Sequence, residues 1–206
     1  VSQHADGAQV TLKTPKGDTL VNARYVVGGD GMHSIVRTAA GIEFEGSTYE
    51  ESFVLADVRM QWSLGTSEVS LFFSPTGVVV VAPLPDGAYR IVATLDNAPE
   101  QPGIADIQAL LDARGPTTGL NRVEEVVWSS RFRVHHRIAR SYRKGPFLLM
   151  GDAAHVHSPA GGQGMNTGIV DAVVLGRLLA DVIHGKQPDA VLDSYGQVRR
   201  PAYGHG

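Results

Sequence analysis

A stretch of small residues, GDAAHVHSPAGGQGMNTGIVDA at positions 151–172, limits what this chain can fold into more than any other feature. It follows an apolar segment, 146–150, that predicts a short buried strand, and it leads into a helical pattern over 166–184 that ends before Gly185. Glycine allows another backbone or a ligand to approach closely. A strand, a glycine-rich loop and a helix in this order are typical of an α/β sheet, in which ligands bind beyond the carboxyl ends of the strands.

Two features of this stretch predict a binding site. Asp152 follows Gly151 at the end of the predicted strand, and its carboxylate can accept hydrogen bonds from sugar hydroxyl groups. Gly164, Met165 and Asn166 enter the helix, where the first N–H groups have no partner within the helix. Because a helix N-terminus carries about half a positive charge, we expect it to hold an anion or a carbonyl oxygen that gains negative charge.

The same glycines do not form the fingerprint of nicotinamide dinucleotide folds. Gly162 and Gly164 match its first two glycines, but Thr167 stands at the third position. A long segment also separates them from the strand, whereas the fingerprint requires a tight strand-to-helix turn. Along the helix that follows, small residues recur every four positions, and this pattern predicts a close-packed face. They are Gly168, Ala172, Gly176 and Ala180.

A second strand–glycine–helix pattern, YVVGGDGMHSIVR, occupies 25–37. Asp30 stands where it can reach a sugar hydroxyl, and Gly31 continues the turn. Ser34 is a candidate N-cap for a short helix over 34–40. Arg37 lies one helical turn further on, where it can reach either a phosphate or Asp30.

The middle of the chain has a different character. Strand patterns cover 53–62, 68–74, 78–83, 88–95 and 124–134, and a helical pattern covers 104–114. The flanking segments alternate strands with helices. We therefore predict an α/β domain made of 1–44 and 136–206, with a mostly antiparallel β-rich substrate domain, 45–135, inserted into it.

Apolar side chains of the inserted sheet are candidates for one wall of a substrate pocket. The candidates are Trp62, Phe72, Phe73 and Val80. Because successive side chains of a strand point to opposite faces, only some of them can line the pocket, and the pattern leaves open which.

Composition and charge exclude several classes of protein. The net charge is −3, with both signs interspersed and no basic stripe, so we expect no nucleic-acid partner. No apolar run is long enough to cross a membrane. The chain has no cysteine, which fits a cytoplasmic location. It begins at Val1 within an apparent hairpin, so we expect it to be the later part of a longer protein.

Histidines and arginines suggest two further interpretations. His155 with His157, and His135 with His136, could be taken for metal ligands, but no cysteine or carboxylate stands at ligand spacing, so we predict no metal site. The basic residues between 131 and 144 are either a solvated rim or an area that attracts an anionic electron donor.

The two glycine-containing stretches together resemble the DG and GD motifs of the group A FAD-dependent aromatic monooxygenases, the para-hydroxybenzoate hydroxylase family. Their order and separation match, and Arg199-Arg200-Pro201 resembles the end of the helix after the GD motif. The resemblance covers nearly the whole chain. It departs from the family at the start, because the family's N-terminal strand–GxGxxG–helix is absent from these residues. The resemblance implies a partial FAD-binding α/β domain with the β-rich substrate domain inserted.

The resemblance also implies which residues bind FAD. Asp152 would bind the ribityl chain, Pro159 would lie near the reactive edge of the flavin, and Asp30 would serve the ribose–pyrophosphate region. Backbone N–H groups at the start of the helix would face N1 and the C2 carbonyl. The complete implied set is Asp30, Gly31, Arg37, Gly151, Asp152, Pro159, Gly162, Gly164, Met165 and Asn166.

The activity implied by the resemblance is hydroxylation of an aromatic or similar electron-rich substrate with O₂ and NADH or NADPH, through a flavin C4a-hydroperoxide. The isolated chain would be inactive, and no catalytic residue is identified. Three alternatives stay open: a non-catalytic substrate-binding or scaffold module, a flavin dehydrogenase, and a hydroxylase of a quinone pathway. The sequence does not indicate the substrate, the choice between NADH and NADPH, or the oligomeric state.

Overall fold

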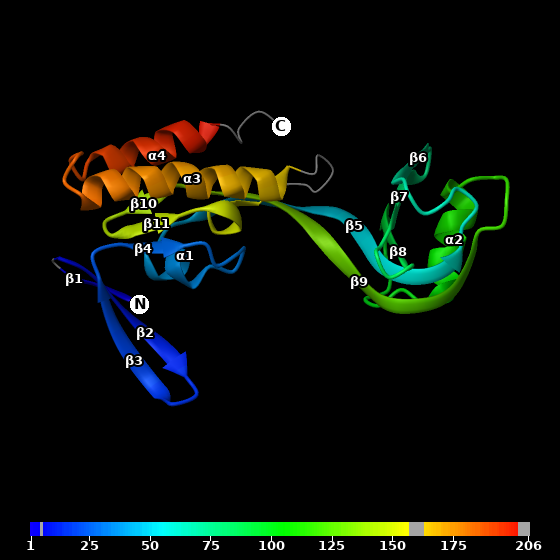
Figure 1. The fold of residues 1–206 in the computed structure, drawn as a ribbon, viewed down its shortest axis with the longest axis horizontal. Coiled ribbons are helices and arrows are strands. Elements are labelled where there is room, and N and C mark those ends of the chain that lie inside the picture. Colours follow the sequence, from blue (N-terminus) through cyan, green and yellow to red (C-terminus); the bar gives the residue numbers. More distant parts are fainter. Residues whose placement is uncertain (5, 157–162, 202–206) are drawn as a thin grey trace. The chain divides into compact units, whose positions relative to one another are not determined.

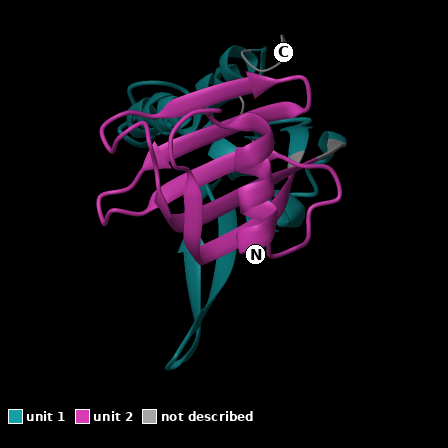
Figure 2. Ribbon diagram, turned by 90° about the vertical axis from the view of Figure 1, so that its right-hand side faces the viewer, with its two compact units in different colours: residues 1–48, 135–206 teal, residues 49–134 magenta. Residues whose placement is uncertain are grey.

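The structure, a computed structural model of the 206-residue chain, describes residues 1–4, 6–156 and 163–201. The chain divides into two compact units, 1–48 with 135–206 and 49–134 (Figure 2). The first unit combines strands with helices, and the second is mostly antiparallel sheet, so the predicted fold class is confirmed. None of the helices in the described residues combines the length and the apolar character needed to cross a membrane.

The first unit begins with a three-stranded antiparallel sheet, β1 (Ser2–His4), β2 (Gly7–Thr14) and β3 (Gly17–Ala23). Thr14 pairs with Gly17 at the tip of the β2–β3 hairpin, where Gly17 has a φ of +110°. The next strand, β4 (Val26–Gly28), belongs to another sheet, in which the Val26 N–H donates to the Pro146 carbonyl at 2.9 Å.

That second sheet has the order β10 (Arg143–Lys144), β11 (Phe147–Leu149) and β4, with β11 and β4 parallel. The helix α1 (Ile35–Ala39) covers one face, and α3 (Gly164–Ile183) and α4 (Val191–Arg199) lie side by side over the other (Figure 1). The short turn η1 (Gly151–Ala153) and the strand β12 (His155–Val156) follow β11. Buried apolar residues of these elements form one core, which includes Phe147, Leu148, Leu149, Leu175, Leu192 and Tyr195.

The face that α3 turns to this core differs from the sequence prediction. Its buried positions are Asp171, Leu175 and Val182, whereas Ala172, Gly176 and Ala180 of the small-residue stripe are exposed. Only Gly168 of that stripe is tightly packed, since a Cβ built on it would lie 3.4 Å from the Gly151 Cα. The prediction of a continuous close-packed stripe is therefore wrong. Burying leucine and valine removes more apolar surface from water than burying alanine or glycine, so the larger residues face the core.

The second unit is built on a sheet in which β5 (Phe44–Gln61) pairs with β8 (Tyr89–Thr94), followed by β7 (Gly77–Pro83) and β6 (Ser70–Ser74). The other neighbour of β5 is β9 (Arg122–Ala139). Both β5 and β9 are longer than predicted, and each begins in one unit and ends in the other. The helix α2 (Ile104–Arg114) has the predicted bounds and packs Ile107, Leu110 and Leu111 against the sheet.

Strand register separates the two faces of this sheet. One face, with Val54, Val79 and Ile91, is buried under α2. The other face, called here the open face, carries two rows of side chains across four strands. The first row is Leu55, Val92, Val80 and Leu71, and the second is Phe53, Thr94, Val78 and Phe73.

The register also decides among the four aromatic and apolar candidates for a pocket wall. Phe72 and Trp62 meet edge to face, with ring centroids 6.1 Å apart, and both pack against the core under α2. Phe73 and Val80 belong to the open face, and Phe73 is 78% exposed. Only this second pair is therefore available as a wall.

Candidate functional site

The two glycine-containing stretches come together at one edge of the β10–β11–β4 sheet. Leu149 of β11 lies beside Gly28 of β4, and the Met150 N–H donates to the Gly28 carbonyl at 2.9 Å. Because the two strands are parallel, the loop after Gly28 and the turn at Gly151 leave from the same carboxyl edge. In open α/β sheets this edge is where ligands bind.

Arg37 joins the two loops directly. Its side chain is 8% exposed and donates to the Ala153 carbonyl at 2.9 Å and to the Met32 carbonyl at 2.7 Å. The guanidinium also lies 3.8 Å from the centroid of the Phe44 ring, a cation–π distance. The sequence left open whether Arg37 reaches a phosphate or Asp30. In this structure its hydrogen bonds tie the first glycine loop to the second.

Asp30 holds the start of α1. Its Oδ2 accepts hydrogen bonds from the N–H groups of Ile35, at 2.8 Å, and Val36, at 3.2 Å. Burial alone would raise the pKa of Asp30, but hydrogen bonds from Ser34 and these amides outweigh it and lower the pKa. The predicted N-cap is confirmed, since the Ser34 Oγ accepts from the Arg37 N–H at 2.9 Å. Gly31 has a φ of +79°, and no atom of the described residues lies within 4 Å of a Cβ built there.

The turn at Gly151 lies against α3. Gly151 has a φ of +57°, a conformation that favours glycine, and its N–H donates to the Asp171 Oδ2 at 3.1 Å. Gly168 of α3 approaches it as described above. The next side chain, Asp152, is exposed and has no hydrogen bond or ion pair to any described residue. Its carboxylate is therefore available to a ligand that donates hydrogen bonds.

The beginning of α3 presents further donors. The first helical hydrogen bond runs from the Thr167 N–H to the Gln163 carbonyl, at 3.0 Å, so the N–H groups of Gly164, Met165 and Asn166 have no acceptor within the helix. Met165 is 76% exposed. The two other predicted residues of this loop, Pro159 and Gly162, lie outside the described residues.

The sequence did not predict a buried ionic cluster beside this turn. Asp171, which is 0% exposed, contacts the His155 Nε2 at 2.5 Å and accepts from the Arg199 Nε at 2.7 Å. The sequence did contain a signal for this cluster. Asp171 lies at helical spacing from Leu175 and Val182, so it belongs to the buried face of α3, and a charged side chain is rarely buried without a partner. His155, considered only as a metal ligand, serves this carboxylate instead. The described residues contain no group of three potential metal ligands.

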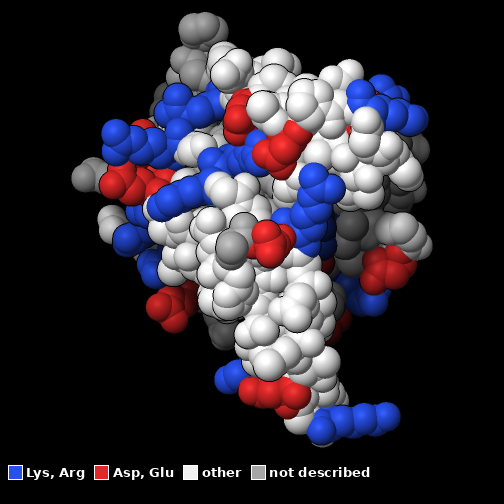
Figure 3. All heavy atoms as spheres, turned by 90° about the vertical axis from the view of Figure 1, so that its left-hand side faces the viewer, with Lys and Arg blue, Asp and Glu red and all other residues white. Residues whose placement is uncertain are grey.

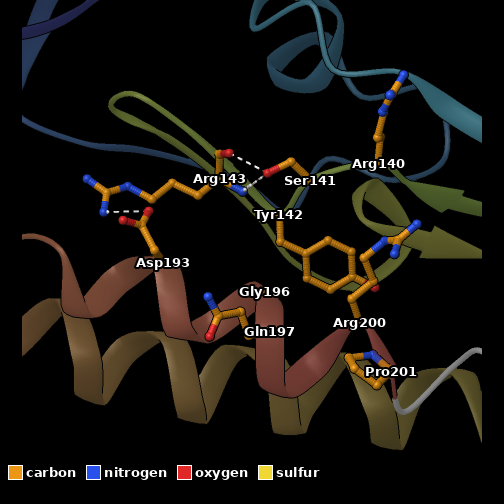
Figure 4. A pocket seen from close by; sticks show the side chains of 9 residues that line it. All are labelled: Arg140, Ser141, Tyr142, Arg143, Asp193, Gly196, Gln197, Arg200 and Pro201. Carbon is orange, nitrogen blue, oxygen red and sulfur yellow. Dashed lines mark hydrogen bonds and ion pairs between the residues drawn. The ribbon is translucent and has the colours of Figure 1, made fainter.

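A hollow of about 340 Å³ lies between α4 and the β10 region, and Arg140, Arg143 and Arg200 are among its lining residues, with side chains that point in different directions (Figure 4). Acidic partners accompany all three. Arg143 pairs with Asp189 and, at 3.1 Å, with Asp193, while Arg140 pairs with Glu43 and Arg200 with Glu45, at 2.8 and 3.8 Å. Basic and acidic side chains also alternate across one face of the molecule (Figure 3). These pairs favour a solvated rim over an anion site.

The sequence profile of the FAD binding domain family matches residues 1–204. The chain belongs to the FAD-dependent aromatic monooxygenase family. FAD is the cofactor of this family, and its members are flavin-dependent oxidoreductases, as the sequence motifs predicted. The two stretches that resemble the DG and GD motifs of the family meet, in their described residues, at the edge of the β10–β11–β4 sheet.

Individual members of the family are similar to this chain over almost its whole length. The 12-dehydrotetracycline 5-monooxygenase/anhydrotetracycline 6-monooxygenase of Streptomyces rimosus subsp. rimosus is 36% identical, over 98% of this chain and 42% of that protein. Pentachlorophenol 4-monooxygenase of Sphingobium chlorophenolicum is 33% identical, over 98% and 38%. A solved ternary complex of aklavinone-11 hydroxylase with FAD and aklavinone has a TM-score of 0.80 at 26% identity, over 98% and 40%. The chain thus spans about two fifths of the length of these relatives.

Proposed function

We propose that residues 1–206 form part of an FAD site in a monooxygenase that hydroxylates an aromatic or similar electron-rich substrate with NADH or NADPH and O₂. One observation carries the proposal: Asp152, an exposed carboxylate with no hydrogen bond or ion pair to any described residue, follows Gly151 at the carboxyl edge of two parallel strands, where the turn lies against α3. A cytoplasmic location, predicted from a chain without cysteine, belongs to the same proposal.

The donors and acceptors of this edge fit FAD. Asp152 can accept a hydrogen bond from a ribityl hydroxyl, and the N–H groups of Gly164, Met165 and Asn166 can face the N1–C2 carbonyl edge of the flavin ring. When bound, FAD would accept electrons from NAD(P)H and pass them to O₂, the source of the transferred oxygen atom. The helix N-terminus favours negative charge on the ring edge that it faces.

We assign the remaining predicted residues to the loops around the cofactor. Asp30 and Arg37 would serve the ribose–pyrophosphate region by holding the loop between them, since their described hydrogen bonds go to backbone groups and to the Ser34 side chain. The open space at Gly31 would let a phosphate approach the backbone. Gly151 would set the direction of Asp152. Pro159 and Gly162 stay in the proposed set on the family resemblance alone.

The open face of the second unit would supply a wall for the substrate. Its two rows are mainly apolar, Leu71 is 55% exposed, and the Phe53 ring stacks on Phe132 with centroids 5.5 Å apart. The Arg90–Asp57 ion pair, at 2.8 Å, borders these rows. An apolar wall with aromatic rings suits a flat, weakly polar ring system.

The test uses the protein that contains this chain. Flavin content is measured after purification, NAD(P)H oxidation is followed with a panel of phenols and polycyclic aromatic compounds, and products are analysed by mass spectrometry under ¹⁸O₂. We expect bound FAD and one labelled oxygen atom in the product. A substrate that is oxidised without gaining labelled oxygen would instead identify a dehydrogenase. Absence of flavin binding would identify a non-catalytic module.

A further inference from the structure

The buried carboxylate of Asp171 connects four segments of the first unit. Asp171 itself lies on α3, and it accepts hydrogen bonds from Gly151 at the start of η1 and from Arg199 on α4, at 3.1 and 2.7 Å. His155 of β12 contacts the same oxygen as Gly151, at 2.5 Å. Segments separated by up to 48 positions in the chain thus meet at one side chain.

Such a carboxylate is stable in the interior only while its partners stay in place. A buried charge without hydrogen bonds is strongly unfavourable, so the three contacts and the carboxylate restrain one another. Arg199 is 13% exposed at its side chain and His155 is 2% exposed, so water replaces neither partner easily.

The restraint acts on the proposed flavin contacts. Gly151 immediately precedes Asp152, and Asp171 lies on the helix whose first residues are Gly164, Met165 and Asn166. The bond from the Gly151 N–H to Asp171 therefore sets the turn that carries Asp152 relative to that helix. The close approach of Gly168 to Gly151 leaves little room for another arrangement.

We propose that Asp171 is a positioning residue for the flavin: it holds the Gly151–Asp152 turn at the correct place beside the N-terminus of α3, without touching the cofactor. The inference rests on the proposed function, which supplies the identity of the ligand, FAD. Its geometric part, the fixed turn, concerns the chain alone and can be tested without flavin.

The first measurement is amide hydrogen exchange of residues 147–156 in the protein without flavin. Asp171→Asn keeps the shape of the side chain but removes its charge, and we expect faster exchange at Gly151, Asp152 and Ala153. Val182→Ala, at another buried position of α3, is the control for a general loss of packing. Unchanged exchange at the turn in Asp171→Asn, or equal acceleration in both variants, would overturn the proposal.

The second measurement is flavin binding, followed by fluorescence and by the visible absorption spectrum. We expect Asp171→Asn to raise the Kd for FAD about tenfold or more, as for side chains that orient metal ligands, and to shift the flavin spectrum. Val182→Ala should leave both nearly unchanged, and Arg199→Lys should retain more affinity than Arg199→Met. Wild-type protein that binds no FAD would refute the proposed function and the flavin part of this inference, while hydrogen exchange would still decide whether Asp171 fixes the turn.

Discussion

Two aspartates of one short stretch have opposite surroundings. Asp152 is exposed and has no hydrogen bond or ion pair to a described residue, whereas Asp171 is fully buried between a histidine and an arginine. The first can be removed without leaving an unpaired buried group, and the second cannot. The two residues therefore separate ligand binding from support of the fold.

For Asp152 we predict a loss of binding without a loss of stability. Asp152→Ala removes one hydrogen bond to a charged acceptor, which contributes about 1.5–3 kcal/mol, so the Kd for FAD should rise about 10- to 150-fold. Flavin titration and thermal melts check this. Asp181→Ala, which removes a partly exposed carboxylate elsewhere on α3, should change neither quantity much. Unchanged affinity in the Asp152 variant would show that Asp152 does not contact the cofactor.

Asp171 predicts a specific dependence of stability on pH. Burial raises its pKa, but hydrogen bonds from His155, Arg199 and Gly151 outweigh burial, so the pKa lies below its usual value near 4. Because the folded-state pKa is the lower one, the stabilisation is complete above about pH 4 and is lost as the pH falls through the folded pKa. Melting temperatures between pH 6 and pH 2.5 should therefore fall less steeply for Asp171→Asn than for wild type. Parallel curves would contradict the assignment.

The helix α3 combines one crowded position with an exposed surface. Gly168 faces Gly151, while no atom in the described part of the chain lies within 4 Å of a Cβ built on Gly176. Exposed apolar side chains, Met165, Ile169 and Val173 among them, share the helix with the small residues. The same residue type, glycine, therefore has a packing role at one turn and none at another two turns later.

A matched pair of substitutions tests this difference in the 206-residue chain. Gly168→Leu should destabilise the fold by about 1–3 kcal/mol, because the side chain has no room beside Gly151. Gly176→Leu should be neutral or stabilise by up to about 1 kcal/mol, because leucine favours the helix more than glycine does. Chemical denaturation of both variants measures the free energies of unfolding. Equal destabilisation would mean that α3 packs differently.

The N–H donors at the N-terminus of α3 can be reduced by one substitution. Gly164 is the first helical residue, so Gly164→Pro removes one N–H donor at a position where helices accept proline, and it also restricts the backbone of Gln163. We expect a lower reduction potential of bound FAD and slower reduction by NAD(P)H. Dye-coupled reduction gives the potential, and circular dichroism checks the fold. An unchanged reduction potential in a folded, flavin-containing variant would mean that the start of α3 contributes to packing but does not influence the charge of the flavin.

The two compact units separate the proposed cofactor contacts from the proposed substrate wall. All described candidate FAD residues lie in 1–48 and 135–206, and the open face belongs to 49–134. The predicted boundaries, 1–44, 45–135 and 136–206, and the names given to these domains remain predictions.

This separation predicts independent effects of mutation in the protein that contains the chain. Leu71→Asn introduces a polar group on the open face at an exposed position, so the fold and the Kd for FAD should be unchanged. The kcat/KM for an apolar aromatic substrate should fall about tenfold, a difference typical of one altered apolar contact in a pocket. Steady-state kinetics and flavin titration measure the two effects. Loss of FAD binding in this variant would contradict the separation.

Local patterns in the sequence were sufficient for much of this description. Helical periodicity predicted α2 to the residue, the hydroxyl of Ser34 predicted the cap of α1, and the glycine-rich stretches predicted loops at strand ends. These features depend on residues a few positions apart, so the chain encodes them without reference to its fold. The family resemblance rests on the same short stretches.

Contacts between distant residues were decided only by the tertiary structure. Sequence spacing could not indicate that Arg37 would reach the Ala153 carbonyl, or that Asp171 would join Gly151, His155 and Arg199. Sequence spacing also could not indicate which face of α3, or of the β5–β8–β7–β6 sheet, would be buried. Both have apolar residues on two faces, so the sequence pattern is compatible with burial of either face. Packing selects the face that buries more apolar surface, and that choice depends on segments far away in the chain.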